Sequence, residues 1–474
     1  MDQRQGKAPL FDVLVHHRNT ARVNGHVPGH KQGQAFDLQG MNFYRDILDL
    51  DLTEVGDLDD LHEPSGAIQE AQELASELFG AEKTHFLVGG STVGNMALVC
   101  GVCKPGDRLI IQRNSHQSIF NACRLARVQP IYWSGCQIGE DLPFILDPRD
   151  LYQALKLYPD TKAVFITSPG YYGEVQPIAD IAKICHEKGI PLLVDEAHGA
   201  HFGFHPDLPL SALAQGADGV VQSTHKMLPA MTMSSMLHLQ GKRVRRDRVH
   251  QWLTLLQSSS PSYPLMASLD LARRYMASSG ADRLDALLKE MVLVRKKIKG
   301  LSMLEEPDIK IRDPLKMILR SHSGISGFQL LDWFQGRNIF LEMADHRNCL
   351  ASFSVGTMDE DLEYVYEAMK SLDQELISWS SRPSLSSPLL PRISESLFPF
   401  DMEEKNVKQS VPLVEAVARR SAGLVVPYPP GIPLWLPGEL ITGESVEYLH
   451  NLLELGGRVR GMASSFPPQV YVIQ

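Results

Sequence analysis

The sequence predicts an α/β protein with a mostly parallel sheet covered by helices, followed by a small α+β domain and a C-terminal α+β domain. Between residues 84 and 240, short apolar runs alternate with amphipathic segments. Strands that are apolar throughout and alternate with helices are typical of a parallel sheet buried on both faces. The expected strands are 84–88, 108–112, 129–133, 163–168, 191–197, 219–224 and 235–239, and the expected helices include 92–103, 117–127 and 178–188.

The pattern along the chain divides it into five parts. A chain of 474 residues is too long for one compact core. After residue 300 we expect strands at 308–319 and 339–353 and a helix at 359–376, whereas the proline-rich run Val426–Pro433 cannot form a regular helix. The expected parts are an N-terminal segment 1–50, a large domain 51–298, a small α+β domain 299–378, a serine- and proline-rich linker 379–400 and a C-terminal domain 401–474.

Composition excludes several classes of protein. The formal net charge of −10 argues against nonspecific nucleic-acid binding, which needs clustered positive charge. No stretch approaches the roughly 18 apolar residues of a membrane helix, and the first residues lack the apolar core of a signal peptide. Six cysteines without dense spacing fit a reducing cytosol, so we expect a cytoplasmic enzyme. Cys100 and Cys103 form a Cys-x-x-Cys pair without further ligands nearby, so we expect buried thiols and no metal.

Polar residues follow four of the expected strands. They are Gly89–Thr92, Asn114–His116, Asp195 and Ser223–Lys226. In such sheets ligands bind beyond the carboxyl ends of the strands, so the four groups are expected on one rim. This convergence is stronger evidence for a site than any one of the motifs.

Lys226 and Asp195 indicate the chemistry of that rim. An enzyme that uses pyridoxal 5'-phosphate needs a lysine to form a Schiff base with the aldehyde and a carboxylate to pair with the protonated ring nitrogen. The apolar residues after Lys226 favour its neutral amine, and Ser223 and His225 would lie on the same side of an extended segment, facing a phosphate. Asp195 could instead cap a following helix. The letters Leu193–His198 also match a helicase magnesium box, but the chain has no phosphate loop to accompany it.

Glycines and histidines complete the candidate site. The turn Gly89–Asn95 joins a strand to a helix N-terminus, where backbone N–H groups and hydroxyls bind phosphate. His116 would stack on the pyridine ring or cap its helix. His198, His201 and His205 suit a metal in spacing, but glycines and a proline interrupt the helix that this would need. We expect His198 to contact cofactor or substrate instead.

The chain resembles the bacterial ornithine/lysine/arginine decarboxylase family in its short form. The matching pieces occur in the expected order over nearly the whole chain. They are Val27–Lys31, Asp57–Gly66, Phe86–Thr92, Ser115–Ser118, Asp195–His198, Ser223–Lys226 and Val426–Pro433. Just after the lysine, where the family usually has a small residue and then a glutamine, this chain has Pro229 and Met233.

The resemblance implies fold type I, the aspartate-aminotransferase fold, with pyridoxal 5'-phosphate as cofactor. It makes Lys226 the Schiff-base lysine and Asp195 the partner of the ring nitrogen, and it places His116 over the ring. The remaining residues expected around the cofactor are Gly90, Ser91, Thr92, Ala197, His198, Ser223 and His225.

The same resemblance implies decarboxylation of a basic amino acid, with arginine slightly preferred over lysine or ornithine. A buried distal cation needs an acidic contact, for which Glu342 and Asp345 are the candidates. The acidic loop Asp57–Asp60, reaching a neighbouring subunit, is an alternative. The protein is expected to be a homodimer or a higher homo-oligomer with the site near the subunit interface. Transamination, aldol cleavage and a non-catalytic role as a cofactor-binding homologue are the alternatives.

Overall fold

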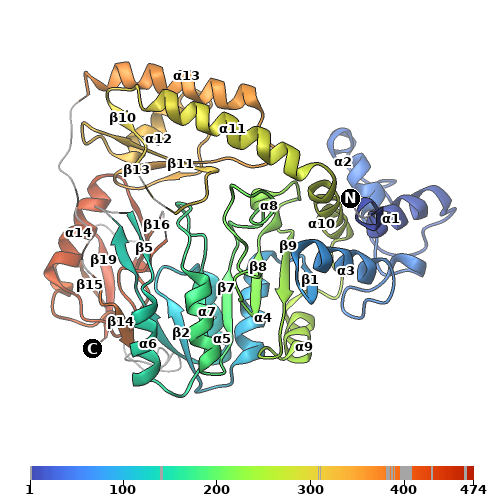
Figure 1. The fold of residues 1–474 in the computed structure, drawn as a ribbon, viewed down its shortest axis with the longest axis horizontal. Helices are drawn as coiled ribbons and strands as arrows, with labels where there is room; N and C mark the ends of the chain where they lie inside the picture. Colours follow the sequence, from blue (N-terminus) through green and yellow to red (C-terminus); the bar gives the residue numbers. More distant parts are fainter. Residues whose placement is uncertain are drawn as a thin grey trace. The chain divides into compact units, whose positions relative to one another are not determined.

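The structure is a computed structural model that describes most of the chain in two compact units. The described residues are 3–138, 142–307, 309, 311–379, 385, 388, 390–395, 408–428, 431–463 and 467–473. The first unit comprises residues 1–102 and 193–284, and the second comprises residues 103–192 and 285–474 (Figure 1). Neither unit coincides with the expected large domain 51–298, because the first unit also includes the N-terminal segment and the second continues to the end of the chain.

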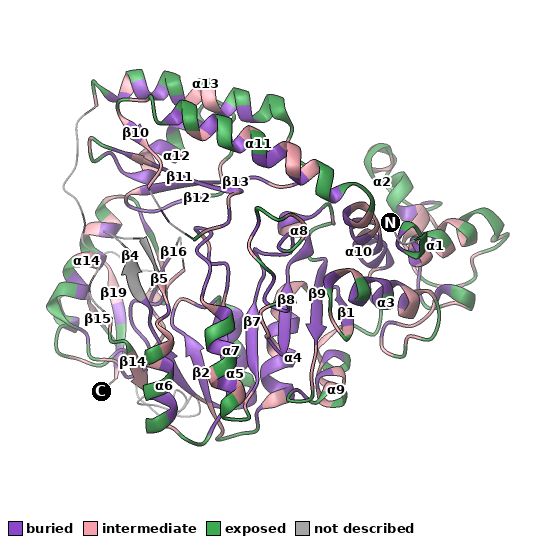
Figure 2. Ribbon diagram, viewed as in Figure 1, coloured by how far each residue is buried: buried purple, intermediate pink, exposed green. Residues whose placement is uncertain are grey.

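Four strands form the sheet of the first unit, in the order β1 (Lys83–Leu87), β9 (Ser235–Leu239), β8 (Gly219–Gln222) and β7 (Leu192–Asp195). β7 and β8 are parallel, whereas β9 runs antiparallel to both of its neighbours. β7, β8 and β9 are buried along their whole length (Figure 2). The helices of this unit are α1 (Pro9–Thr20), α2 (Leu38–Leu50), α3 (Ala67–Phe79), α4 (Gly90–Val102), α8 (Thr224–Met227), α9 (Arg246–Leu256), α10 (Tyr263–Tyr275) and the start of α11 (Ala281–Ile298).

A glycine allows α4 to lie close to the sheet. A Cβ on Gly94 would be 2.7 Å from a Leu87 methyl of β1 and 3.0 Å from a Val221 methyl of β8. Side chains that close would force the helix away from the strands. The N-terminal turn of α4 is therefore held directly against the ends of β1 and β8.

The N-terminal segment is attached to α10 by a buried ion pair. Arg273 and Asp270 are fully buried and pair at 2.7 Å. The guanidinium also donates to the Gln5 carbonyl at 2.6 Å, and the Asp270 carboxylate accepts the Leu10 N–H at 3.0 Å. These contacts explain why residues 1–50 belong to the first unit instead of standing apart.

The second unit contains a sheet in the order β6 (Thr161–Thr167), β2 (Arg108–Gln112), β3 (Gln129–Trp133) and β14 (Ile393–Glu395). β2 is parallel to β6 and to β3, and β14 is an antiparallel edge strand. Part of the expected linker 379–400 thus pairs with β3. The first half of the unit also contains α5 (Gln117–Ala126), α6 (Pro148–Leu157), α7 (Ile178–Glu187) and the hairpin β4 (Cys136–Ile138) and β5 (Leu142–Ile145).

An antiparallel sheet follows, in the order β10 (Leu304–Glu305), β11 (Lys316–Ser321), β13 (Asn348–Ser352) and β12 (Met343–Ala344), together with α12 (Gly327–Gln335) and α13 (Asp359–Leu376). The helix expected at 359–376 is confirmed. The single strand expected at 339–353 is wrong: the Asp345 carboxylate accepts the N–H groups of Arg347 and Asn348, each at 2.7 Å, and this turn reverses the chain. Of the strand expected at 308–319, only the end from Lys316 is a strand, and residues 308 and 310 lie outside the described part.

The C-terminal part has its own small core. Its strands are β15 (Lys408–Pro412), β16 (Val426–Tyr428), β17 (Arg458–Arg460), β18 (Met462–Ala463) and β19 (Gln469–Ile473), and its helix is α14 (Gly443–Glu454). Thr442 begins α14 with a capping box, and Trp435 is buried with its indole N–H on Ser445 Oγ at 2.9 Å. Within the described ranges, no helix is long and apolar enough to cross a membrane.

Candidate functional site in the first unit

Lys226 lies on a one-turn helix, α8, directly after β8. The Lys226 N–H donates to the Ser223 carbonyl at 3.0 Å, and the Leu228 N–H donates to the Thr224 carbonyl at 2.9 Å. The expectation of an extended segment here is therefore wrong. Because the chain turns, Ser223 and His225 make separate contacts instead of lying side by side.

The Lys226 amine is hydrogen-bonded to His198. Lys226 Nζ and His198 Nε2 are 3.0 Å apart, and His198 is buried. His198 reaches this position because the chain turns back after β7, where the Gly199 N–H donates to the Glu196 carbonyl at 2.9 Å. This imidazole can therefore exchange a proton with the lysine amine.

Asp195 ends β7 as a buried carboxylate. Its Oδ2 accepts a hydrogen bond from Asn95 Nδ2 at 3.0 Å, and its Oδ1 accepts the Ala197 N–H at 3.1 Å. Both donors are neutral, so among the described residues these bonds orient the carboxylate without neutralising its charge. A buried negative charge of this kind fits a ligand with a cationic N–H.

Asn95 is a contact that the sequence interpretation missed. It is the last residue of the turn Gly89–Asn95, and it is fully buried on α4. The signal was present: Asn95 follows Ser91 by four residues, which places both side chains on the same face of the helix. One face of α4 thus carries both Ser91 and the Asn95 amide that donates to Asp195.

The turn at the start of α4 lies against the segment that begins α8. Ser223 Oγ donates to Ser91 Oγ at 2.9 Å. The Gly90 N–H is already bonded to the Met233 carbonyl at 3.0 Å, so it is not a donor for a ligand. The hydroxyl pair and the helix N-terminus, which has no acidic residue in its first turn, can bind an anion such as a phosphate. Thr92 lies in that first turn.

His225 uses one ring nitrogen inside the protein. Its Nδ1 bonds the Ser234 carbonyl at 2.9 Å, which requires the proton on Nδ1 and leaves Nε2 for a ligand. Burial lowers the pKa of His225, and the neighbouring Lys226 charge lowers it further. A phosphate dianion would have to supply the attraction that protonates Nε2.

A string of buried polar side chains crosses the sheet next to Asp195. Glu196 accepts from Gln222 Nε2 at 2.7 Å, and Gln222 Oε1 lies 3.2 Å from His238 Nε2, whose Nδ1 is 2.8 Å from the Thr84 hydroxyl. Burial lowers the pKa of His238 to about 3 and raises that of Glu196 to about 8. A neutral His238 that donates from Nε2 and accepts at Nδ1 satisfies every bond in this string.

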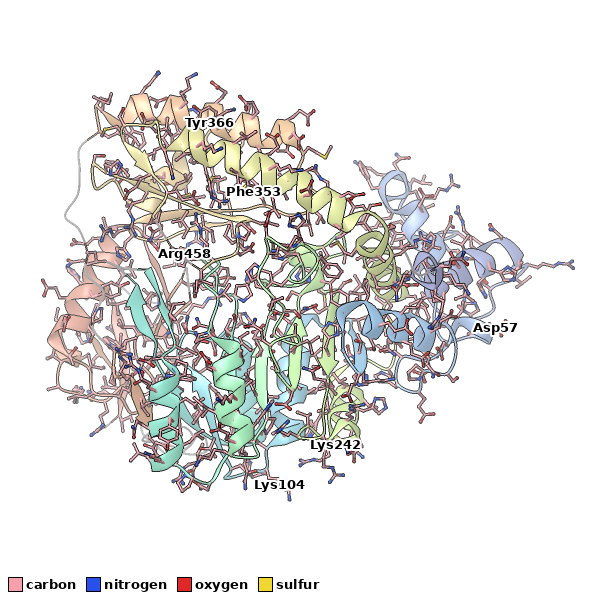
Figure 3. All side chains as sticks on the ribbon, in the orientation of Figure 1. Asp57, Lys104, Lys242, Phe353, Tyr366 and Arg458 are labelled. Atoms are coloured by element: carbon pink, nitrogen blue, oxygen red, sulfur yellow. The ribbon has the colours of Figure 1, made fainter. Side chains whose placement is uncertain are left out.

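The loop Asp57–Asp60 is used within its own unit. The Asp59 carboxylate accepts the N–H groups of Ser65, Gly66 and Ile68, at 2.8–2.9 Å, and so begins α3. Asp57 lies at the outer edge of the unit, away from α8 (Figures 1 and 3). Within one chain, Asp57 is therefore distant from α8.

The described residues contain no group of three or more potential metal ligands. His201 is fully buried beside the Phe202 ring, and His205 bonds the Asp207 N–H at 3.1 Å. Burial raises the pKa of the Cys100 thiol to about 11, which disfavours a thiolate ligand.

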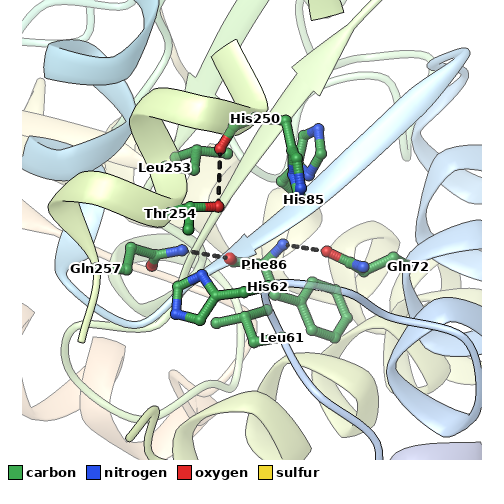
Figure 4. A pocket seen from close by; sticks show the side chains of 9 residues that line it. All are labelled: Leu61, His62, Gln72, His85, Phe86, His250, Leu253, Thr254 and Gln257. Atoms are coloured by element: carbon green, nitrogen blue, oxygen red, sulfur yellow. Dashed lines mark hydrogen bonds between the residues drawn. The ribbon is translucent and has the colours of Figure 1, made fainter. Parts of the chain in front are cut away.

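A small polar pocket lies elsewhere on the first unit, between α3, β1 and α9 (Figure 4). Its lining residues are Leu61, His62, Gln72, His85, Phe86, His250, Leu253, Thr254 and Gln257. Burial lowers the pKa of His85 to about 3, so this imidazole is neutral beside His250. None of the residues expected around the cofactor lines this pocket.

Candidate functional site in the second unit and relatives

His116 is the N-cap of α5. Its Nδ1 accepts the Ser118 N–H at 3.2 Å and is 2.8 Å from the Ser118 hydroxyl, while the residue remains exposed. The capping role considered from the sequence is therefore present. The exposed ring also remains able to stack on a ligand.

The same strand end holds the proline-rich motif of the C-terminal part. Arg113 is buried and donates to both carboxylate oxygens of Glu439 at 2.6 Å. Its guanidinium also donates to the carbonyls of Pro433 at 3.3 Å and Leu434 at 3.0 Å. A bidentate pair of this kind fixes orientation as well as charge, so the C-terminal motif is anchored three residues before His116.

The two carboxylates expected to meet the substrate differ in availability. Asp345 is buried, and besides its own turn it accepts the Tyr172 hydroxyl and Asn348 Nδ2. Glu342 is exposed. Because the Asp345 oxygens already have several donors, Glu342 is the stronger candidate for a distal cation.

Glu174 is a buried acid that the sequence did not suggest. It lies in the loop after β6 at 1% exposure, and among the described residues its Oε2 has no hydrogen-bond partner. Gly170 makes room for it, because a Cβ there would lie 1.8 Å from Glu174 Oε1. Burial raises the pKa of Glu174 from 4.5 to about 8.

This raised pKa predicts a loss of stability with rising pH. The folded protein holds a proton on Glu174 that the unfolded chain releases above pH 4.5, so the free energy of unfolding falls between pH 4.5 and about 8. Glu174→Gln should flatten this fall by at most about 5 kcal/mol. Urea unfolding at pH 5 and pH 9 measures this fall in the free energy of unfolding, and the exposed Glu187→Gln is the control. If the free energy of unfolding falls equally with pH in wild type and E174Q, the raised pKa of Glu174 is contradicted.

Two family models match the chain: the Orn/Lys/Arg decarboxylase major domain over residues 8–309 and the C-terminal domain of that family over residues 399–467. The chain belongs to the Orn/Lys/Arg decarboxylase family. The family membership predicted from the sequence motifs is confirmed, and the chain is a decarboxylase.

Relatives of this Orn/Lys/Arg decarboxylase cover nearly its whole length. The uncharacterized protein YaaO of Bacillus subtilis is 40% identical over 96% of each chain. The arginine decarboxylase of the same organism is 35% identical over 99% of this chain and 98% of its own, and the inducible lysine decarboxylase of Escherichia coli is 24% identical over 96% and 78%.

Solved structures show the fold of this Orn/Lys/Arg decarboxylase. The Francisella novicida lysine decarboxylase LdcF superposes with a TM-score of 0.85 at 20% identity, covering 98% of this chain and 81% of its own. The predicted α/β fold with a mostly parallel sheet, fold type I, is confirmed.

Proposed function

We propose that this protein decarboxylates a basic amino acid with pyridoxal 5'-phosphate as cofactor, giving the corresponding amine and carbon dioxide. The observation that carries the proposal is the cradle in the first unit. There Lys226 is hydrogen-bonded to His198, Ser223 is hydrogen-bonded to Ser91 at the start of α4, and the buried Asp195 carboxylate accepts from two neutral donors, Asn95 and the Ala197 N–H. We call the hydroxyl pair of Ser91 and Ser223 at the N-terminus of α4 the anion cup. The lysine amine, the anion cup and the buried carboxylate are the three groups that an aldehyde, a phosphate and a pyridinium require.

The residues of the site fit the cofactor, and each of them would contact a different part of it. When bound, pyridoxal phosphate supplies an electron sink for the carbon that loses carbon dioxide. Asp195 would keep the ring nitrogen protonated, and Asn95 would orient that carboxylate. Lys226 would hold the aldehyde carbon and release it to substrate, while His198 at 3.0 Å would hold or move the proton on Nζ. His116 would cover the ring, and Ser91, Thr92, Ala197, Ser223 and His225 would complete the cofactor site, with Gly90 shaping its turn.

We propose arginine as the preferred substrate, with Glu342 as the first candidate for its distal cation. Relatives named arginine decarboxylase are 33–35% identical to this chain over 92–99% of its length, against 24% for the lysine decarboxylases. We also propose that the protein is cytoplasmic and works as a homodimer or larger homo-oligomer with the site near the interface.

The test is to incubate the protein and pyridoxal phosphate with arginine, lysine and ornithine separately. We expect carbon dioxide and amine in equal amounts, with the highest kcat/KM for arginine. A keto acid or an aldehyde in place of carbon dioxide would point to transamination or aldol cleavage. Release of carbon dioxide only from lysine or ornithine would reject the arginine preference and leave the reaction class standing.

A further inference from the structure

Met233 has a backbone conformation that methionine rarely adopts. Its φ is +77°, in the left-handed region that favours glycine. For a residue with a Cβ this conformation is strained. The side chain is 49% exposed, so its packing does not account for the strain. The reason must lie in what the backbone contacts.

The carbonyls of Met233 and Ser234 contact both halves of the anion cup. The Met233 carbonyl accepts the Gly90 N–H at 3.0 Å, at the start of α4. The Ser234 carbonyl accepts the His225 N–H at 3.2 Å and lies 2.9 Å from His225 Nδ1, on α8. Successive carbonyls thus join two elements that are more than a hundred residues apart in the sequence.

Ser234 also attaches this pair of residues to α10. It is fully buried, and its hydroxyl donates to the Leu265 carbonyl at 3.1 Å and lies 3.0 Å from Ser268 Oγ. Met233 and Ser234, called the clasp below, therefore connect α10 to the turn at Gly90 and to the turn at His225.

We infer that the clasp sets the geometry of the anion cup and that Met233, through its left-handed backbone, is the positioning residue that holds Gly90 and His225 in place for a phosphate. The inference rests on the proposed function for the identity of that phosphate. The clasp occupies the Gly90 N–H and fixes the His225 ring, so Ser91, Thr92, Ser223 and His225 Nε2 remain for the ligand. If Met233 left the left-handed region, the carbonyls of Met233 and Ser234 could no longer bond the Gly90 turn and α8 at the same time.

The test compares pyridoxal phosphate with pyridoxal, which lacks the phosphate, by titrating the full-length protein and recording visible absorbance. Met233→Val disfavours a positive φ through its branched Cβ, and should weaken pyridoxal phosphate at least tenfold while leaving pyridoxal unchanged. Met233→Gly keeps the positive φ and should bind both as wild type does. Met231→Val changes an exposed methionine outside the positive-φ region and is the matched control. Ser234→Ala removes only the hydroxyl anchor and should show a smaller loss of the same kind.

A second arm separates this inference from the proposed function. Inorganic phosphate should raise the melting temperature of wild type and of M233G, and should not raise that of M233V. If wild type binds no pyridoxal phosphate, the proposed function fails, while the phosphate arm still decides the clasp. If M233V and S234A keep the wild-type ratio of pyridoxal phosphate to pyridoxal affinity, or lose both ligands equally, the clasp is rejected.

Discussion

Replacing Lys226 by alanine is expected to abolish turnover and the visible absorbance of the lysine-bound cofactor. The variant has no amine to hold the aldehyde carbon or to release the product, and no neighbouring described residue on α8 offers another primary amine. The proposed anion cup does not include Nζ, so K226A should still bind pyridoxal phosphate, though without the covalent bond. The measurements are amine formation under saturating cofactor and substrate, and absorbance spectra before and after substrate is added.

A chemical label makes this prediction specific to one lysine. Borohydride adds hydrogen across a carbon–nitrogen double bond, so it should fix the cofactor permanently to the wild-type protein on the peptide that contains Lys226. Exposed Lys242→Ala, on the same unit, is the matched control and should be labelled and active like wild type (Figure 3). Label on another lysine, or undiminished turnover in K226A, would contradict the assignment.

The strands that precede the site residues could be predicted from the sequence, because a strand buried on both faces needs mostly apolar residues. The strands expected at 108–112, 129–133 and 235–239 have those bounds in the structure. Each is a short and mostly apolar segment, which follows from burial on both faces. The position of Asp195 and of Lys226 just beyond such runs follows from the same physics.

The features that the sequence did not predict depend either on short local turns or on contacts between residues that are distant in sequence. A one-turn helix such as α8 is too short for a helical period, so Lys226 was expected on an extended segment. The reversal at Asp345 comes from one side chain bonding two backbone N–H groups, which an apolar pattern does not register. Asn95 and Met233 acquire their roles only from Asp195 and Gly90, which the fold brings to them.

Asp195→Asn is expected to lower kcat on the order of 10²–10³-fold, the usual effect of removing one preorganised electrostatic group. Asparagine has the size of aspartate, and its one amide oxygen can still accept the Ala197 N–H. Its NH2 group replaces the oxygen that accepts from Asn95, and a rotated Asn95 amide would present its own oxygen to that NH2, so the fold should be kept. What is lost is the negative charge that keeps the ring nitrogen protonated. Asp195→Glu, which keeps the charge, should recover part of the rate, and the exposed Asp207→Asn should change nothing. Initial rates and melting temperatures measure these effects.

A cofactor analogue distinguishes this role of Asp195 from a structural one. In 1-deazapyridoxal phosphate a carbon replaces the ring nitrogen, so there is no proton for a carboxylate to hold. Wild type and D195N should then be slowed to similar rates, because the charge of Asp195 no longer has a partner. If D195N keeps its full penalty with the analogue, the carboxylate acts on the protein instead of on the ring. Its bonds to Asn95 and Ala197 would then be its function, and the ring-nitrogen assignment would fall.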